Sequence, residues 1–254
     1  MSALQQCCKA IKTAAVLWAV VHNAAKKSLI LHIMKSLSNV KEILAFLREL
    51  ESNNDRAWFK ANKDRYDALR KPWEADVERL ISLVAQFDPD TRGLTVQQAV
   101  YRIYRDVRFS KDKSPYKTYF SAVVSGRGRK EVRSCDYVHF QPGRLMIGGG
   151  IWCPERDVLQ QLRSLIDAEQ EEFEHIAQGP AFKQGFQWES DSLKNVPRDY
   201  PKDHKLAKFL KMKEYLVTRH LSEDYFDCDD WVERVAADLK TLQPLHQFLN
   251  YVFE

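Results

Sequence analysis

The sequence contains few of the residues that build disulfide-stapled or metal-centred proteins. Its 254 residues include only five cysteines, at spacings that match no zinc-binding or disulfide pattern. An odd number of cysteines without a framework favours reduced thiols, so we expect no structural disulfide and a cytoplasmic location. HExxH, CxxC and a histidine–carboxylate triad are also missing from the sequence pattern, so we expect no tightly bound metal and no cofactor.

Motifs that mark the common enzyme classes are missing as well. The sequence has no GxGxxG or Walker spacing for a phosphate-binding loop and no GxSxG for a serine nucleophile. The uncharged stretch Thr13–Ala25 is thirteen residues long, whereas a membrane-spanning helix needs about 20. We therefore predict no transmembrane segment, and whether the chain is an enzyme stays open at this point.

The first 35 residues differ in charge from everything that follows them. They contain five lysines and no acidic residue, and the patterning of a folded domain begins only after Met34. One interpretation is that Met34 is the true start. Others are an amphipathic helix, or a weak targeting segment with a basic start, an apolar run and small residues at Ala24–Ala25. We treat residues 1–35 as a doubtful N-terminal extension and residues 36–254 as a single α+β domain.

The first part of this domain is predicted to be helical. The chain is 44% hydrophobic and 29% charged, which is typical of a folded core with a charged surface. Apolar residues three and four apart predict helices over 40–50, 58–69 and 73–84. We expect the second and third of these helices to be separated by a break or restart at Pro72.

From about Val100 the pattern changes to short runs of β-branched and aromatic residues. These runs are typical of strands that lie close in sequence without helical crossovers, and a helix or helix pair follows at the C-terminus. We therefore predict an α+β fold, with an antiparallel sheet of four to six strands flanked by N-terminal and C-terminal helices. The expected strands are 101–109, 116–124, 136–140, 145–151 and 215–218, with a hairpin turn at Gln141-Pro142-Gly143-Arg144. The expected later helices open near Pro154 and fill 231–253 with an interruption at Pro244.

Positive charge is concentrated in residues 101–133, which hold ten basic and three acidic side chains. A concentrated positive field favours phosphates, carboxylates or nucleic acid as partners. Arginine binds carboxylate or phosphate in a bidentate way, and lysine adds a mobile point charge. The segment 102–117 is therefore predicted to form an anion-binding site. Its basic residues are Arg102, Arg105, Arg108, Lys111, Lys113 and Lys117.

The same segment also admits a structural interpretation. If residues 101–109 form a strand, Arg105 shares a face with Ile103 and Val107, so it is expected to be buried and paired with an acid. In that case the cations form an ion-pair network with Asp106, Asp112 and the acidic helices. The sequence alone does not separate this network from an anion site.

A few other residues are weaker candidates. Gly148, Gly149 and Gly150 precede the helix that opens near Pro154, so they either let a backbone approach a phosphate or form a glycine-bearing strand end. For acid–base catalysis the candidates are Asp106, Asp112 and His139. A single histidine in a strand, however, is commonly a hydrogen-bonded structural residue.

The central segment also carries a resemblance to a known family. The matching features are Asn53-Asn54 followed by Trp58-Phe59 and Asn62-Lys63-x-x-Tyr66, then the block from Arg102 to Lys117, then Gly148-Gly149-Gly150-Ile151-Trp152-x-Pro154, and finally Asp203-His204. Over about residues 37–253 the chain resembles a family of conserved hypothetical proteins, catalogued as domain of unknown function twenty-four sixty-one. The resemblance implies membership without implying an activity or catalytic residues.

Three hypotheses for function follow from these patterns. The first is a domain that binds a phosphate- or carboxylate-bearing ligand, a small molecule or nucleic acid, through residues 102–117. The second is an enzyme that acts on a phosphorylated or nucleic-acid substrate at the same site. The third is a protein-interaction domain whose basic face docks an acidic partner. The sequence does not separate the three. Convergence of the cations on an open pocket would favour ligand binding, whereas full pairing with carboxylates would favour a structural network.

Overall fold

A computed structural model describes residues 36–254, and the doubtful extension predicted for residues 1–35 lies outside the described residues. Residues Leu37–Glu254 form one compact unit. Within residues 36–254 no helix is both long and apolar enough to cross a membrane.

The N-terminal helices begin and end where the capping residues predict. Asn39 accepts a hydrogen bond from the backbone of Glu42 at the start of α2 (Val40–Ser52), and Asp55 caps α3 (Arg56–Ala61). The next helix, α4 (Lys63–Val84), contains Pro72. The predicted break at Pro72 is therefore wrong. Buried residues on both sides of this proline, including Trp73, pack in one core, and this packing outweighs the local preference to break.

The sheet has five antiparallel strands in the order β1-β2-β3-β5-β4, which confirms the predicted α+β class. The hairpin turn predicted between β2 and β3 falls at Pro142 and Gly143. Its strands are β1 (Phe120–Val124), β2 (Cys135–Gln141), β3 (Arg144–Ile151), β4 (Gln187–Trp188) and β5 (Tyr215–Leu221).

The remaining helices are short segments around this sheet. Pro244 lies in the first turn of the last helix, so the interruption predicted there separates two helices. These elements are α5 (Val96–Ala99), α6 (Arg156–Ala168), α7 (Gln170–Ala177), α8 (Pro180–Lys183), α9 (Ala207–Leu210), α10 (Trp231–Lys240) and α11 (Gln243–Asn250), with 3-10 turns at Pro89–Thr91, Gly128–Lys130, Glu223–Phe226 and Tyr251–Phe253.

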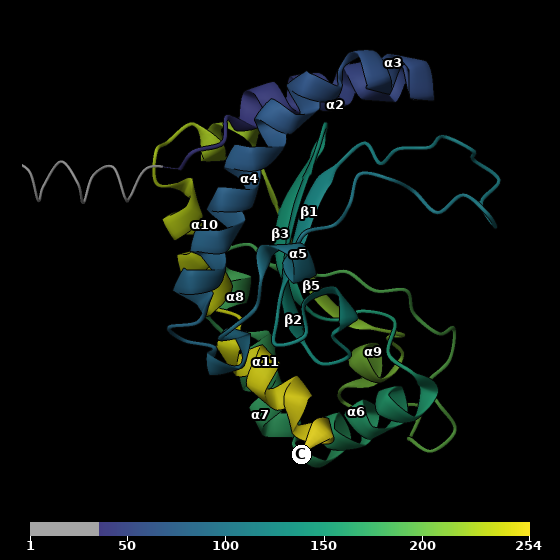
Figure 1. The fold of residues 1–254 in the computed structure, drawn as a ribbon. Helices are drawn as coiled ribbons and strands as arrows, with labels where there is room; N and C mark the ends of the chain where they lie inside the picture. Colours follow the sequence, from purple (N-terminus) through teal and green to yellow (C-terminus); the bar gives the residue numbers. More distant parts are fainter. Residues whose placement is uncertain (1–35) are drawn as a thin grey trace, which may run out of the picture. The chain divides into compact units, whose positions relative to one another are not determined.

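The core lies between one face of the sheet and the helices α2, α4 and α10, which Figure 1 shows together on one side of the strands. Phe140 of β2 points into this layer, and its ring lies 4.8 Å from Trp73 of α4 and 5.5 Å from Trp231 of α10. Side chains alternate along β2, so Tyr137, His139 and Gln141 lie on the opposite face. That second face is the one that borders the candidate site.

A hydrogen-bonded serine, histidine and aspartate join the last helix to the sheet. Ser134 Oγ lies 2.6 Å from His246 Nδ1, and His246 Nε2 lies 2.9 Å from Asp136 Oδ1, with all three side chains buried. The sequence pattern gave no sign of this set, because its members come from two segments about 110 residues apart. It fastens α11 to β2.

The glycines of β3 are required by close backbone contacts. A Cβ on Gly148 would lie 2.3 Å from the carbonyl oxygen of Val217 in β5, and one on Gly149 would lie 2.6 Å from the His246 ring. Gly150 has φ +126 and would meet the carbonyl oxygen of Tyr215. These contacts support the strand interpretation of the glycine run.

Replacing Gly148 with alanine is therefore expected to push β5 away from β3. We predict that Gly148→Ala lowers the free energy of unfolding by about 1–3 kcal/mol, the usual cost of overpacking a rigid core. Gly143→Asn is the matched control, because Gly143 has φ +73 with open space around it and asparagine tolerates that conformation. Urea denaturation measures both variants, and equal stability of the two would contradict the packing argument.

Candidate functional site

Residues 101–118 form a two-legged arm, and the strand predicted over 101–109 is wrong. The legs meet at an isolated bridge between Tyr104 and Tyr116, and Arg105 N donates to the carbonyl of Pro115 at 2.9 Å. Figure 1 shows this segment extending away from the sheet beside β1. The alternation in the sequence was genuine, but in the first leg only Tyr101 bonds the sheet, through its amide and the carbonyl of Ser121 in β1. Beyond it, the first leg pairs with the second leg of the arm.

The base of the arm is held by one asparagine side chain. Asn54 Nδ2 donates to the carbonyl of Tyr116 at 3.0 Å, and the amide of Tyr116 donates to Asn54 Oδ1 at 3.1 Å. One side-chain amide thus satisfies both backbone groups of a buried residue, as a neighbouring strand would. The Phe59 ring also stacks on Tyr116, with centroids 4.0 Å apart. These contacts fix the base of the arm to the helical layer.

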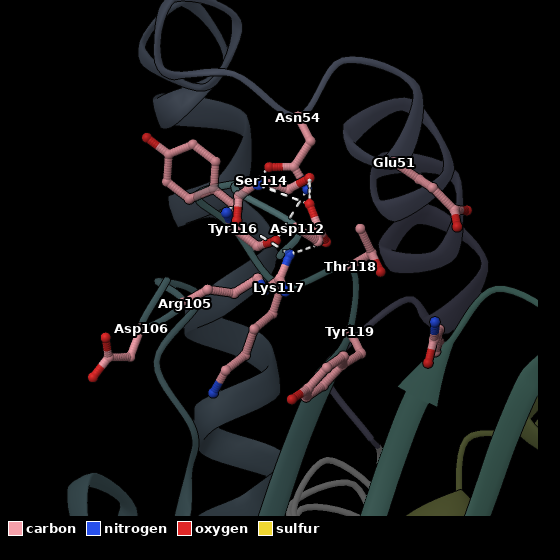
Figure 2. Close-up of a pocket in the computed structure, with 11 residues that line it drawn as sticks. Glu51, Asn54, Arg105, Asp106, Asp112, Ser114, Tyr116, Lys117, Thr118 and Tyr119 are labelled. Atoms are coloured by element: carbon pink, nitrogen blue, oxygen red, sulfur yellow. Dashed lines mark hydrogen bonds and ion pairs between the residues drawn. The ribbon is translucent and has the colours of Figure 1, made fainter. Parts of the chain in front are cut away.

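A cleft of about 560 Å³ lies between the arm, the end of α2 and the edge of the sheet. Figure 2 shows the hydrogen bonds from Ser114 and Arg105 to Asp112 inside it, with Thr118 and Tyr119 alongside. The lining is polar and mixed in charge. The lining residues are Glu51, Asn54, Arg105, Asp106, Asp112, Ser114, Tyr116, Lys117, Thr118, Tyr119 and Gln141.

Three of the six predicted anion-binding residues have partners within the arm. Arg105 pairs with Asp112 and donates to the carbonyl of Ser114 at 3.2 Å. Arg108 forms a bidentate ion pair with Asp106, in which Nε donates to Oδ1 at 3.0 Å and Nη2 donates to Oδ2 at 2.7 Å. Lys113 Nζ donates to the carbonyl of Val107.

The expectation for Arg105 is confirmed in one respect and corrected in the other. Its guanidinium is paired with an acid, but the side chain is 26% exposed rather than buried. The reason is the arm itself, because outside a sheet no second layer covers Arg105.

The other three predicted residues have no acidic partner among residues 36–254. Arg102 and Lys111 are exposed, whereas Lys117 is half-buried beside the cleft. Lys117 Nζ lies 4.8 Å from the centre of the Tyr101 ring and 5.6 Å from that of Tyr119. Tyrosine faces attract a cation without neutralising its charge.

The environment of Lys117 is strongly positive. Burial lowers the pKa of its ammonium below the ordinary value, and repulsion from Arg102, Arg129 and Arg70 lowers this pKa further. Two of these arginines are held in place by backbone carbonyls: Arg129 donates to Gln97 and Gln98, and Arg70 donates to Tyr101. The cluster of Lys117, Arg102, Arg129 and Arg70 is called the cation cluster below.

The three acid–base candidates are poorly matched to proton transfer near neutral pH. The hydrogen bond from Arg108 lowers the pKa of Asp106 to about 2, and hydrogen bonds from Ser114 and then Arg105 lower the pKa of Asp112. Burial lowers the pKa of His139, whose ring nitrogens hydrogen-bond Tyr137 at 2.9 Å and Gln141 at 3.0 Å. Both carboxylates are ionised at neutral pH and His139 is neutral, so none is poised to exchange a proton there.

The glycine run lies apart from this cleft. Gly148 pairs with Tyr137 and Gly150 pairs with Cys135, whereas the cleft borders β2 at its other end, at Gln141. Within residues 36–254 there is also no group of three histidine, cysteine or acidic side chains that could hold a metal ion.

The residues that sequence reasoning missed are those that hold the site together. Asn54, Arg129 and Arg70 reach the arm from segments that are distant in the sequence. A signal for Asn54 did exist, since Asn53-Asn54 opens the family pattern together with Phe59 and Tyr66, which pack in one aromatic cluster at the base of the arm.

Comparison with known proteins identifies the family. A family model described as conserved hypothetical protein (DUF2461) matches residues 42–248, and the chain belongs to this family of unknown function. No curated protein and no solved structure matches the chain.

Removing the Asn54 side chain is expected to release the arm. Asn54→Ala leaves a backbone amide and a carbonyl of buried Tyr116 without partners, so we predict a loss of about 1–3 kcal/mol in the free energy of unfolding. The amide of Tyr116 should also lose its protection in hydrogen exchange. The control is Asn53→Ala, because Asn53 is exposed and its side chain bonds only the carbonyl of Glu49. Wild-type protection of Tyr116 in Asn54→Ala would contradict the role assigned to Asn54.

Proposed function

We propose that this domain binds an anion, a phosphate or carboxylate group on a larger ligand, at the cation cluster beside the cleft. The observation that carries the proposal is the state of Lys117. It is a half-buried ammonium with no hydrogen-bonded acid among residues 36–254, and the charges that act on it come from three arginines. An unpaired charge of this kind raises the free energy of the protein until a counter-ion binds.

The arrangement around Lys117 favours an anion over a neutral ligand. Arg129 and Arg70 use part of their guanidinium groups on backbone carbonyls, which fixes their positions before any ligand arrives. Positioned cations bind a phosphate or carboxylate without the entropic cost of ordering long side chains. Arg102 and Lys117 supply the unpartnered charge.

The ion pairs of the arm are compatible with this proposal. Asp112 and Asp106 neutralise Arg105 and Arg108, and these pairs shape the arm as the structural interpretation expected. In the cluster at the base of the arm Arg70 pairs with Glu74 of α4 at 2.7 Å, whereas Arg102, Arg129 and Lys117 have no acidic partner among residues 36–254. The two hypotheses for residues 102–117 therefore apply to different cations of the same segment.

We further propose a reducing compartment, the cytoplasm, as the location of this protein. Cys135, Cys153 and Cys228 are free thiols, which suits such a compartment. Phosphate-bearing small molecules are abundant ligands there, and an acidic protein partner would meet the same cations.

Removing the charge at Lys117 tests the proposal directly. Inorganic phosphate should raise the melting temperature of the wild-type protein in a saturable way, because it binds the native state only. Lys117→Met keeps the aliphatic stem but removes the ammonium, so we predict that calorimetry finds phosphate affinity at least about 10-fold weaker. Arg102→Ala should weaken binding as well.

The control for charge is Lys213→Ala. Lys213 is an exposed lysine next to β5, near the end of the sheet that pairs with Ile151 and away from the cleft. The Lys213→Ala variant should bind phosphate as tightly as the wild-type protein does. If phosphate gives no saturable shift in the wild type, or if Lys117→Met and Lys213→Ala bind it equally, the proposal fails.

A further inference from the structure

The tip of the arm carries an almost fully exposed aromatic side chain, and the Arg108 guanidinium lies 5.8 Å from the centre of its ring. Phe109 is 95% exposed, and Tyr104, on the same leg, is 49% exposed. A solvated phenylalanine ring is costly in water, and here it lies on a segment rich in positive charge. The anion proposal leaves these rings unused.

Charge along the arm is only partly neutralised. Asp106 and Asp112 pair with Arg108 and Arg105, which leaves Arg102, Lys111, Lys113 and Lys117 without an acidic partner among residues 36–254. These four cations run from the base of the arm to its tip, and the exposed rings lie among them. Alternating cations and exposed rings are the features that bind a single-stranded nucleic acid, whose phosphates meet the cations while its bases stack on the rings.

The length of the arm suits an elongated ligand. Tyr104 at the base and Phe109 at the tip are five positions apart, which allows up to about 17 Å of extended chain. A polymer of phosphates and bases can follow the whole leg.

We infer that the arm binds single-stranded nucleic acid, with backbone phosphates on the cation cluster and on Lys111 and Lys113, and bases stacked on Phe109 and Tyr104. This inference rests on the proposed anion site, since Lys117 anchors one phosphate of the strand. A lipid bilayer is the other partner that basic residues around an exposed phenylalanine would suit. It fits less well, because the half-buried Lys117 is recessed beside the cleft, where a flat surface does not reach.

The experiment measures fluorescence anisotropy of labelled oligo-dT and oligo-U of about 12 nucleotides, a length within the usual site size. Both should bind, and the logarithm of affinity should fall with that of salt with a slope of about −2 to −3, as expected when three or four cations each neutralise one phosphate. A duplex of equal length should bind more weakly, because its bases are already stacked on each other. A difference between the two oligomers would show that the ribose hydroxyl is recognised.

Phe109→Ala separates this inference from the anion proposal. We predict that it weakens oligonucleotide affinity by about 5- to 100-fold, the effect of losing one stacked base, while phosphate affinity at Lys117 stays at the wild-type value. Tyr251→Ala is the matched control, because Tyr251 is 64% exposed and lies in a 3-10 turn at the C-terminus. Lys117→Met should weaken both ligands.

The outcomes that overturn the inference are distinct from those that overturn the anion site. If phosphate binds but oligonucleotides do not, or if Phe109→Ala binds them like Tyr251→Ala, the nucleic-acid inference fails and the anion site stands. If the protein instead binds phosphatidylserine vesicles in a Phe109-dependent way and no oligonucleotide, the arm is a membrane contact. If neither phosphate nor oligonucleotide binds, both proposals fail.

Discussion

The two hydrogen bonds between the Asn54 side chain and the backbone of Tyr116 are the constraint on which the site depends. Beyond its base the arm has no strand neighbour among residues 36–254, so its legs are held there by each other, and at the base by this contact together with the Phe59 ring and the hydrogen bond from Arg70 to Tyr101. Asn54 follows α2, and its position is fixed in turn by the cap that Asp55 provides to α3. The cap at Asp55 and the bridge from Asn54 thus fix the position of Tyr116, the residue before Lys117.

The basic side chains of the arm and its base fall into two groups, those paired with an acid and those without an acidic partner. Arg105 and Arg108 are neutralised by aspartates within a few residues of them. Exposed pairs of this kind contribute little to stability, and their effect is to shape the arm and reduce its self-repulsion. At the base, a backbone carbonyl orients Arg129 and aromatic rings lie beside Lys117, and both keep an uncompensated charge, whereas Arg70 also pairs with Glu74.

The sequence was sufficient for features that depend on local periodicity and turn chemistry. The amphipathic spacing of Val40 to Leu50 predicted α2, and the turn before Arg144 predicted the β2–β3 hairpin, because these signals act over a few residues. It failed where partners are distant. The alternation in 101–109 is the same whether this segment pairs with a sheet or with the second leg of the arm. Likewise, the presence of Pro72 did not indicate that the packing of Trp73 would keep α4 continuous.

Side-chain constellations were the least predictable features. Ser134, Asp136 and His246 meet only because α11 packs on β3 and β2, and the Gly149 position is small because the His246 ring occupies that space. Basic density in residues 102–117 did predict where unpaired charge would lie. It could not predict that Lys117 would be half-buried without a counter-ion while Arg105 and Arg108 of the same run are paired.

The central claim is that Lys117 is an unsatisfied cation awaiting an anion, and its own titration tests that claim most directly. Burial and three arginines disfavour the charged form, so the pKa of Lys117 in the free protein lies below the ordinary 10.5. A bound anion favours the charged form, so saturating sulfate should raise that pKa back toward the ordinary value. NMR titration of the Lys117 side-chain nitrogen, with and without sulfate, measures both quantities. The account predicts a lowered midpoint that sulfate raises; an ordinary midpoint that sulfate leaves unchanged would contradict it.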